Sequence, residues 1–366
     1  MFTLKKNVIL STTIMAVLSG SAFAAPQVIN IDRPNSSGIS VNDSKSFNVG
    51  PNGMILNNSA TAAKTQLGGQ IQGNKNLVNG KMANVIVNEV LGSQVSKLNG
   101  IIEVAGQKAD VIIANPNGIN CSGCGFINAN RAVLSAGYYM NGKTLISPSS
   151  NKSIITFTGK GLVNPDLADL ELNAKKISIN APVKVNNVHM NASWAAPTTV
   201  AIDVGSLGKI EADSIYMVAQ KGSSAFAVNN NGLLQANKIN IDTAGNIVYG
   251  PNEGSITNTG LIHGSDVSVK TGSLANSLNG YIASTKSLNI SSMAFNNNGN
   301  VHSDKDINLK VNDIVNSGLV SSANNTNLSN IVSFKNTYGT IAAKKINIDD
   351  DFFVKVKDIN GDVVYR

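Results

Sequence analysis

"GLIHGSDVSV" (Gly260 to Val269) contains the pattern that decides the fold of this chain. Apolar and polar residues alternate on both sides of small residues, as they do in two short β-strands joined by a turn. The pattern returns at "GYIASTKSLNI" (Gly280 to Ile290) and at "GNVHSDKDINL" (Gly299 to Leu309). The unit therefore repeats after about twenty residues, a spacing typical of solenoid proteins.

Glycines that begin these units are each followed two positions later by an apolar residue and four positions later by a small one. The apolar positions are Ile210, Leu234, Ile262, Ile282, Val301, Val320 and Ile341. The small positions are Ala212, Ala236, Gly264, Ser284, Ser303, Ser322 and Ala343. A second alternating segment follows in each unit, for example at Ile239 and Ile241.

Two strands this short cannot bury their apolar side chains alone, whereas stacked units form a continuous core. The repeat thus predicts an all-β protein, a parallel β-helix or solenoid. The alternative is an antiparallel sandwich of short strands, which does not need small residues at fixed offsets. Asparagines before several of the glycines (Asn231, Asn279 and Asn298) predict turns with positive φ or stacked side-chain amides.

The composition agrees with an elongated all-β body. Charged residues make up 14% of the chain, aromatic residues 5% and hydrophobic residues 42%. This apolar fraction is too large for a disordered chain, and the Asn, Ser and Gly content is atypical of a helical globular enzyme. A length of 366 residues would otherwise suggest two or three domains, but the internal repetition indicates one rod.

The two ends of the chain carry their own signals. Lys5 and Lys6 precede the apolar run 8–18, and the small residues before Ala25 suit a signal peptidase, so residues 1–24 are expected to be an export signal. The mature chain should be soluble and outside the cytoplasm. Residues 27–60 are expected to cover the open sheet edge at the N-terminal end of the rod. Residues 349–366 predict a terminal hairpin around Asn360-Gly361 or a truncated end.

Three segments carry a resemblance to a known family. They are "GGQIQGNKNL" (Gly68 to Leu77), "NVIVNEV" (Asn84 to Val90) and "SKLNGIIEVAGQKADVIIANPNGINCSGCGFINANRAVLSAG" (Ser96 to Gly137). They closely resemble the N-terminal secretion domain of two-partner-secretion exoproteins, the haemagglutination-activity domain of filamentous haemagglutinins, haemolysins and contact-dependent inhibition proteins. The resemblance implies this domain over residues 25–260, and the repeats of about twenty residues continue over 261–348.

Two short motifs of that family can be placed on the sequence. The second hallmark, Asn-Pro-Asn-Gly-Ile, is matched by Asn115, Pro116, Asn117, Gly118 and Ile119. The first hallmark, Asn-Pro-Asn-Leu, corresponds to Asn74, Lys75, Asn76 and Leu77. Lysine replaces proline there, so this turn loses its fixed φ. The resemblance implies that both groups of residues form the secretion motif.

The family also implies an architecture and a route. We expect a right-handed β-helix with an N-terminal cap and small extra-helical hairpins, exported through the periplasm of a Gram-negative bacterium. The periplasmic domains of a dedicated outer-membrane β-barrel transporter would recognise it, and the product would be secreted or held at the cell surface. The expected function is that of a short or truncated filamentous-haemagglutinin-like adhesin, with a host-cell or bacterial surface receptor or glycan as its partner.

Two other functions stay open at this point. One is a fragment of a haemolysin or of a contact-dependent-inhibition toxin-delivery protein. The other is a β-helical polysaccharide-processing enzyme, which would need clustered carboxylates on one face of the rungs. The repeats carry Asn, Ser and Lys at those positions, so no catalytic residues and no enzyme activity are predicted.

Cys121 and Cys124 are the only cysteines of the chain. In an exported protein we expect them to form a structural disulfide that holds a surface turn beside the second motif. A redox site would place the C-x-x-C at the start of a helix, but this segment is rich in turn residues. A zinc site needs about four ligands, and the histidines His189, His263 and His302 are not paired with the cysteines. We expect no metal and no cofactor.

Other motifs do not lead to a ligand. "GYYMNGKT" (Gly137 to Thr144) matches the pattern of a phosphate-binding loop, but no helix is expected after it. Asn141-Gly142 instead predicts a hairpin turn, and no nucleotide partner. The aspartates of 349–351 and 358–362 lack the spacing of a calcium loop, and Trp194 is expected to pack in an irregular loop. The lysines are scattered despite a pI of 9.2, which predicts no nucleic-acid partner.

Overall fold

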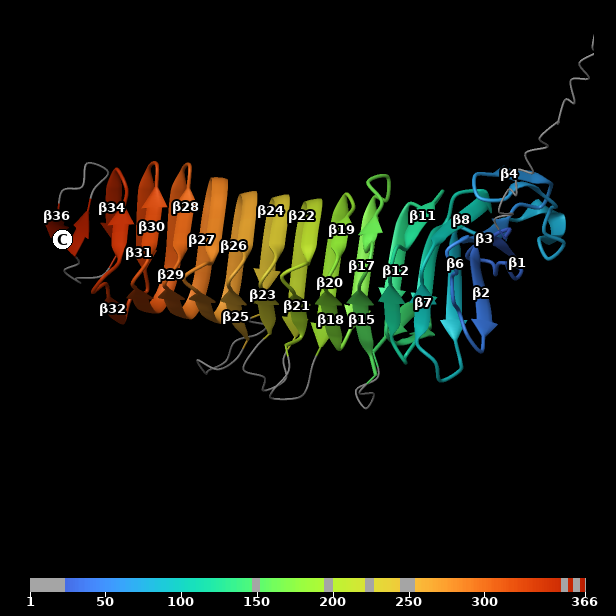
Figure 1. Ribbon diagram of the computed structural model, residues 1–366, viewed down its shortest axis with the longest axis horizontal. Helices are drawn as coiled ribbons and strands as arrows, with labels where there is room; N and C mark the ends of the chain where they lie inside the picture. Colours follow the sequence, from blue (N-terminus) through green and yellow to red (C-terminus); the bar gives the residue numbers. More distant parts are fainter. Residues whose placement is uncertain are drawn as a thin grey trace, which may run out of the picture.

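The computed structural model describes residues 24–146, 152–193, 200–220, 227–243, 254–349, 355–357 and 363–365. The predicted signal peptide lies almost entirely outside the described residues, and so does Trp194. Strands stack side by side along one long axis, from the N-terminal to the C-terminal end of a rod (Figure 1). The described residues include one short 3-10 helix, Val78–Gly80, and no helix that could cross a membrane.

Two parallel sheets form the rod. The smaller sheet has four strands: β1 (Gln27–Asn30), β3 (Met54–Asn58), β8 (Ile101–Gly106) and β11 (Gly125–Ile127). The larger sheet has 26 strands. In its N-terminal half these are β2 (Ile39–Ser44), β6 (Val85–Val90), β7 (Ser96–Leu98), β9 (Asp110–Ala114), β10 (Ile119–Cys121), β12 (Arg131–Ser135), β15 (Ile154–Phe157), β16 (Leu162–Val163), β17 (Asp169–Ala174), β18 (Lys176–Ile179), β19 (Pro182–Lys184), β20 (Asn187–Ser193) and β21 (Ile202–Val204).

The C-terminal half of the larger sheet contains longer strands, several of which pair with two successive strands of a neighbouring turn. They are β22 (Lys209–Gln220), β23 (Val228–Asn230), β24 (Leu233–Asp242), β25 (Ser255–Asn258), β26 (Leu261–Asn276), β27 (Tyr281–Asn297), β28 (Asn300–Ser303), β29 (Asp306–Asn316), β30 (Leu319–Ser322), β31 (Asn325–Ser329), β32 (Ser333–Lys335), β33 (Thr340–Ala342) and β34 (Lys345–Ile348).

Three antiparallel hairpins lie outside the two parallel sheets. They are β4 (Ala63–Thr65) with β5 (Gly69–Ile71), β13 (Tyr138–Met140) with β14 (Lys143–Leu145), and β35 (Lys355–Lys357) with β36 (Val363–Tyr365). All strand pairs of the two large sheets are parallel, for example β6 with β9 and β24 with β26. The fold is therefore the predicted parallel β-helix with small extra-helical hairpins, and the antiparallel sandwich is excluded.

Equivalent positions of the sequence repeat pair with each other between neighbouring turns of the rod. The apolar positions pair from turn to turn as Ile210, Leu234, Ile262, Ile282, Val301, Val320 and Ile341, and all of them are buried. A second inward column runs through Ile215, Ile239, Val267, Leu288, Ile307, Thr326 and Ile346. Because a register slip by one residue would turn every inward side chain outward, these columns specify the stacking.

The repeat glycines allow neighbouring turns to approach closely. A Cβ atom on Gly260 would lie 2.1 Å from the carbonyl oxygen of Gly232, and one on Gly318 would lie 2.1 Å from that of Gly299. The described residues with positive φ do not include these glycines or Asn231, Asn279 and Asn298. The prediction of positive φ at those asparagines was therefore wrong. Glycine is needed there because only hydrogen fits against the preceding turn.

Stacked amides are present, but on other asparagines than the predicted ones. A buried ladder links Asn230, Asn258, Asn276, Asn297, Asn316 and Asn336, and each side chain donates to the next across 2.8 Å. A second ladder of Asn289, Asn308, Asn327 and Asn347 runs along the outside of the rod. The inner ladder satisfies polar groups that would otherwise be buried without partners.

The N-terminal end of the rod is closed by the expected segment. β1 and β2 are the outermost strands of their sheets, since their parallel partners are β3 and β6 only. Ile31 lies between them and is fully buried. The chain after it runs along β2, where the backbone oxygen of Asp32 accepts a hydrogen bond from Ser40 Oγ at 2.8 Å and its backbone N–H donates one to Asn42 Oδ1 at 2.8 Å. These contacts occupy part of an edge that would otherwise be open to other chains.

The inner ladder leads to a prediction about stability. Asn276→Ala should lower the free energy of unfolding by about 1–3 kcal/mol, because the amides of Asn258 and Asn297 would lose a buried partner. Asn308→Ala, in the half-exposed outer ladder, is the matched control and should cost about 1 kcal/mol or less. Urea unfolding of both variants measures the difference, and equal losses would contradict the distinction between the ladders.

Candidate functional site

Residues Asn115 to Ile119 form the turn between β9 and β10. The backbone closes the turn with a 3.0 Å hydrogen bond from Gly118 N to Asn115 O. The Asn115 side chain is fully buried, and its Oδ1 accepts a hydrogen bond from the backbone N–H of Asn117 at 2.9 Å. Gly118 has a φ of 106°, and a Cβ there would lie 2.8 Å from Ile154 O. Asparagine and glycine are thus both needed for the turn to fit between its neighbours.

The side-chain amides of this turn reach to the preceding turn of the rod. Asn115 Nδ2 donates to Gln94 O and to Ser96 Oγ, each at 2.9 Å. Asn117 Nδ2 donates to Gly92 O at 2.8 Å. Ile119 then enters the core as the first residue of β10. The motif therefore links two successive turns.

Residues Asn74 to Leu77 repeat this geometry near the N-terminal end. Asn74 Oδ1 accepts the backbone N–H of Asn76 at 2.9 Å, and Leu77 N donates to Asn74 O at 3.2 Å. Asn74 Nδ2 donates to Ile31 O and Asn57 O, both at 2.9 Å, and Asn76 Nδ2 adds a 3.1 Å bond to Ile31 O. This turn therefore links Ile31, in the segment between β1 and β2, to Asn57 of β3.

The replacement of proline by Lys75 leaves the turn in place. In both motifs, Oδ1 of the first asparagine accepts a hydrogen bond from the backbone N–H two residues later. Its backbone oxygen accepts another from the N–H three residues later. Proline favours this turn by presetting φ, but the asparagine oxygen holds it through a hydrogen bond. Lys75 itself is exposed to solvent. The two motifs belong to different turns of the rod and make separate sets of contacts.

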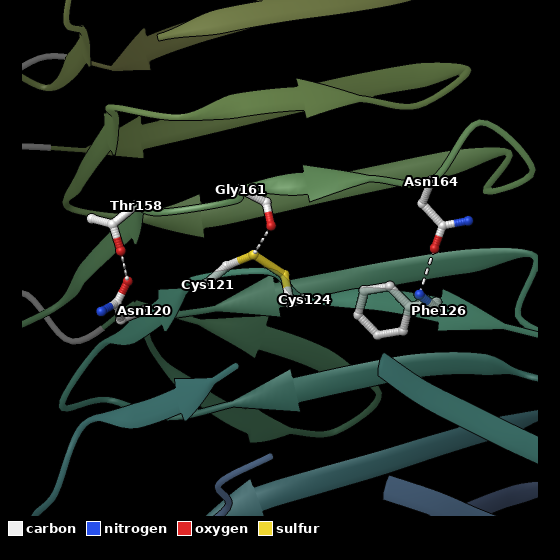
Figure 2. Close-up of a disulfide and its surroundings, with 7 residues drawn as sticks. All are labelled: Asn120, Cys121, Cys124, Phe126, Thr158, Gly161 and Asn164. Atoms are coloured by element: carbon white, nitrogen blue, oxygen red, sulfur yellow. Dashed lines mark hydrogen bonds between the residues drawn. A yellow bond between two sulfur atoms is a disulfide. The ribbon is translucent and has the colours of Figure 1, made fainter. Parts of the chain in front are cut away.

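The cysteines form a disulfide. Cys121 and Cys124 are 0% and 2% exposed and belong to the main hydrophobic core, so the bond itself lies inside the rod, beneath the half-buried residues Ser122 and Gly123 that it spans. Figure 2 shows the bond directed toward Gly161 of the next turn, whose carbonyl oxygen lies 3.2 Å from Cys121 Sγ. On either side, Asn120 pairs with Thr158, and Phe126 N donates to Asn164 Oδ1. The disulfide lies one strand after the Asn115 turn.

The predicted hairpin turn at Asn141-Gly142 is confirmed. Both residues have positive φ, 51° and 79°, and they join β13 to β14. The hairpin packs Tyr139 against an apolar strip on the outer face of the sheet, which consists of Val87, Ile112 and Val133. Its backbone is not followed by a helix among the described residues, so the phosphate-binding geometry is not formed there.

A cavity of about 430 Å³ lies beside this hairpin. Glu171 lines it, pairs with Arg131 and accepts a hydrogen bond from Asn173 Nδ2 at 2.7 Å. Partial burial would by itself raise the pKa of Glu171, but the hydrogen bonds from Asn173 and Arg131 and the charge of Arg131 outweigh it. The pKa of this carboxyl therefore lies below its ordinary value.

Two related turns were missed by the sequence analysis. Asn35 begins a turn in which its Oδ1 accepts the N–H of Ser37 at 3.0 Å and Gly38 N returns to Asn35 O at 3.0 Å. Asn164 begins another, closed by a 3.0 Å bond from Leu167 N. The available signals were Asn-Ser-Ser-Gly-Ile at 35–39, which shares asparagine, glycine and isoleucine with the second motif, and Asn-Pro-Asp-Leu at 164–167.

In the described part of the chain, no three His, Cys, Asp or Glu side chains lie close enough together to bind a metal ion. Asp350, Asp351 and all of 358–362 lie outside the described residues. The absence of a metal and of a cofactor therefore stays a prediction.

The fold and its amide-anchored turns define a class: a parallel β-helical domain whose outermost strands β1 and β2 are joined by a segment that packs over its end. The model of the TPS secretion domain matches residues 20–286, more than half of the chain. The chain belongs to this family, the two-partner secretion exoproteins, as the resemblance predicted. These exoproteins pass through the periplasm and across the outer membrane of Gram-negative bacteria to the extracellular space or the cell surface. A transporter in the outer membrane recognises the secretion domain.

Several individual proteins are similar to parts of this chain. Toxin CdiA of Yersinia pestis is 38% identical over 260 residues, which are 66% of this chain and 8% of that protein. The tRNA nuclease CdiA of Yersinia mollaretii is 40% identical over 213 residues, 53% of this chain and 7% of that protein. A crystal structure of the filamentous hemagglutinin secretion domain aligns with a TM-score of 0.40 at 22% identity, covering 88% of this chain and 92% of that chain. The chain spans less than a tenth of the two CdiA relatives.

Because both cysteines are buried, the disulfide should be protected from reducing agents in the folded protein. Replacing both Cys121 and Cys124 by alanine should lower the free energy of unfolding by about 2 kcal/mol, because the short closed loop restricts the unfolded chain. In the wild type, dithiothreitol should reduce the bond in urea but not in buffer, since both residues are buried. Titration of free thiols measures this, and equal reduction rates in the two conditions would contradict the core position.

The Glu171 pair predicts a pH dependence. Glu171→Gln should lower the melting temperature at neutral pH by removing the ion pair with Arg131. Because the folded-state pKa is depressed, this stabilisation is present above the unfolded-state pKa and is lost as pH falls through the folded-state pKa. The difference between wild type and variant should therefore shrink from about pH 7 to about pH 3. Differential scanning calorimetry across this range checks it, and a constant difference would contradict the assignment.

Proposed function

We propose that residues 25–260 are the part of the exoprotein that engages the periplasmic domains of its transporter, with Asn74 to Leu77 and Asn115 to Ile119 as the secretion motif. The observation that carries this proposal is the shared, buried amide geometry of the two turns. Residues 261–348 continue the rod as a shaft, and the strands β35 and β36 pair as a hairpin after it.

The motif acts through the fold in this proposal. Asn74 and Asn115 are 2% and 0% exposed, so a partner cannot touch them in the folded domain. Removing either side chain would leave buried carbonyl groups without donors and loosen the turn. The transporter would then meet an N-terminal end with a different surface or a different folding rate.

Two exoprotein types are compatible with this secretion domain. The elongated shaft, with polar side chains on its outside, suits an adhesin of the filamentous-haemagglutinin type that presents itself to a surface receptor or glycan. The identity of 38–40% to CdiA proteins favours the second candidate, a contact-dependent toxin-delivery protein. In both, the described β-helix would serve transport and presentation and would not act as an enzyme.

Secretion tests the proposal. The chain is expressed with and without a matching outer-membrane barrel, and protein in the medium is measured for wild type, Asn115→Ala and Asn308→Ala. Release should require the barrel and fall about tenfold or more in Asn115→Ala, because the turn loses two buried hydrogen bonds to the neighbouring turn. Asn308→Ala, an asparagine of the outer ladder, should be released like wild type.

Lys75→Pro refines the test. Since the turn already forms around Lys75, the substitution should change release by no more than about twofold, a free-energy difference well below 1 kcal/mol. Retention of the wild type in the periplasm with the barrel present would contradict the proposed function. Restoration of release by proline from a defective wild type would show that proline, not the asparagine pair, makes the motif competent.

A further inference from the structure

The cavity of about 430 Å³ beside the β13–β14 hairpin has no part in the secretion motif. Ile112 and Val133, register partners on β9 and β12, line it from the outer face of the larger sheet. Tyr139 of the hairpin packs against the same two residues and lines the cavity with them. The volume lies within the range of pockets that hold small ligands, about 300–1,000 Å³. One side of the cavity is therefore apolar and carries an aromatic ring.

The other side of the cavity is polar and ordered by hydrogen bonds. Asn191 Nδ2 donates to Asn173 Oδ1 at 2.9 Å. Asn173 Nδ2 in turn donates to Glu171 Oε1 at 2.7 Å, and it lies 3.3 Å from Thr144 Oγ1 of the hairpin. All four residues line the cavity. An amide has two N–H donors and a carbonyl acceptor, so these side chains keep further groups for a ligand while their positions are fixed.

The charges around the cavity compensate one another. Arg131 pairs with Glu171, and their side chains are 41% and 25% exposed. Asp169 is the register partner of Arg131 on β17, and the charge of Asp110 interacts with the same guanidinium group. Lys143 of the hairpin adds a second cation to the lining. Since neither sign dominates, the cavity does not favour a strongly charged ligand.

The backbone beneath the cavity offers no free strand edge. β12 is paired with β9 and β17, and β17 is paired with β12 and β20. An extended peptide binds a sheet by adding hydrogen bonds to an open edge. Here the sheet presents its face, so a ligand must be recognised by side chains. These side chains suit an uncharged ligand that is apolar on one face and rich in hydrogen-bonding groups elsewhere.

We propose that this cavity binds an uncharged pyranose residue of a glycan on another cell's surface. The inference rests on the proposed function, in its first candidate, an adhesin, and names the site and the class of ligand. The C–H face of a pyranose ring packs against the electron-rich face of an aromatic ring, here Tyr139. Each sugar hydroxyl both donates and accepts hydrogen bonds, which matches the amides of Asn173 and Asn191 and the carboxylate of Glu171.

The register places two more rings next to the cavity. Glu171 pairs with His189 of β20, and His189 pairs with Tyr216 of β22. The centroids of the two rings are 5.9 Å apart, and both side chains are half-exposed. The next sugar residues of the glycan would lie over these rings, so the bound chain runs along the axis of the rod.

Saturation-transfer NMR and calorimetry of the purified mature chain test the site. The probes are the neutral trisaccharides maltotriose, cellotriose, mannotriose and galactotriose, and trigalacturonate is the acidic counterpart of the last. At least one neutral probe should bind. Tyr139→Ala should raise its Kd at least about tenfold, and Asn191→Ala, on the opposite side of the cavity, about fivefold.

Two matched controls lie on the shaft. Tyr338→Ala removes an aromatic ring that is 86% exposed, and Asn308→Ala removes an amide of the outer ladder. Both should bind the probe within about twofold of the wild-type Kd. Melting temperatures establish that all four variants are folded.

Three results would overturn the inference. The first is that no neutral trisaccharide binds, and the second is a wild-type Kd in folded Tyr139→Ala and Asn191→Ala. The third is tighter binding of trigalacturonate than of galactotriose, which would assign the cavity to acidic sugars. Release that depends on the barrel, without sugar binding, would overturn the site and leave the proposed transport intact. Sugar binding by a chain that the barrel does not release would contradict the transport proposal and leave the site standing.

Discussion

The structure depends on the register of parallel turns stacked by backbone hydrogen bonds. Each turn has little core of its own, so its apolar side chains are buried only when they align with those of the turns on both sides. The column through Ile210, Leu234 and Ile262 shows this alignment over the shaft. Glycines permit the approach of the turns, and the buried asparagine ladder pairs amides at a corner where strand pairing alone leaves polar groups. A fold of this kind must also close its first turn, because an open edge would pair with other chains.

The family motifs take part in that closure. Asn74 and Asn76 hold Ile31 O at the end of the rod, and Asn115 and Asn117 hold the next exposed loop. In the proposed function these side chains act on export by holding the neighbouring turns in place, because they are too buried for direct contact with a partner in the folded domain.

The sequence was sufficient for the fold class and for the inward columns, because period-two alternation and a fixed repeat follow directly from strand geometry. It was insufficient where the direction of a side chain depends on how the chain bends. The inner ladder uses Asn276 and Asn297, whereas the asparagines adjacent to the glycines were expected. The disulfide points inward for the same reason. The position of the loop at 91–95 has no sequence signal, since its backbone is held by amides more than twenty residues away.

Hydrogen–deuterium exchange of the folded wild type and of Asn115→Ala tests most directly whether the motif acts through the fold. If it does, amide protection in the variant falls in residues 91–98 and 115–121, while the shaft at 261–348 keeps its protection, because each turn contacts only its neighbours. Unchanged exchange in a variant that is no longer secreted would contradict this account, and would mean that the transporter contacts the motif side chain itself.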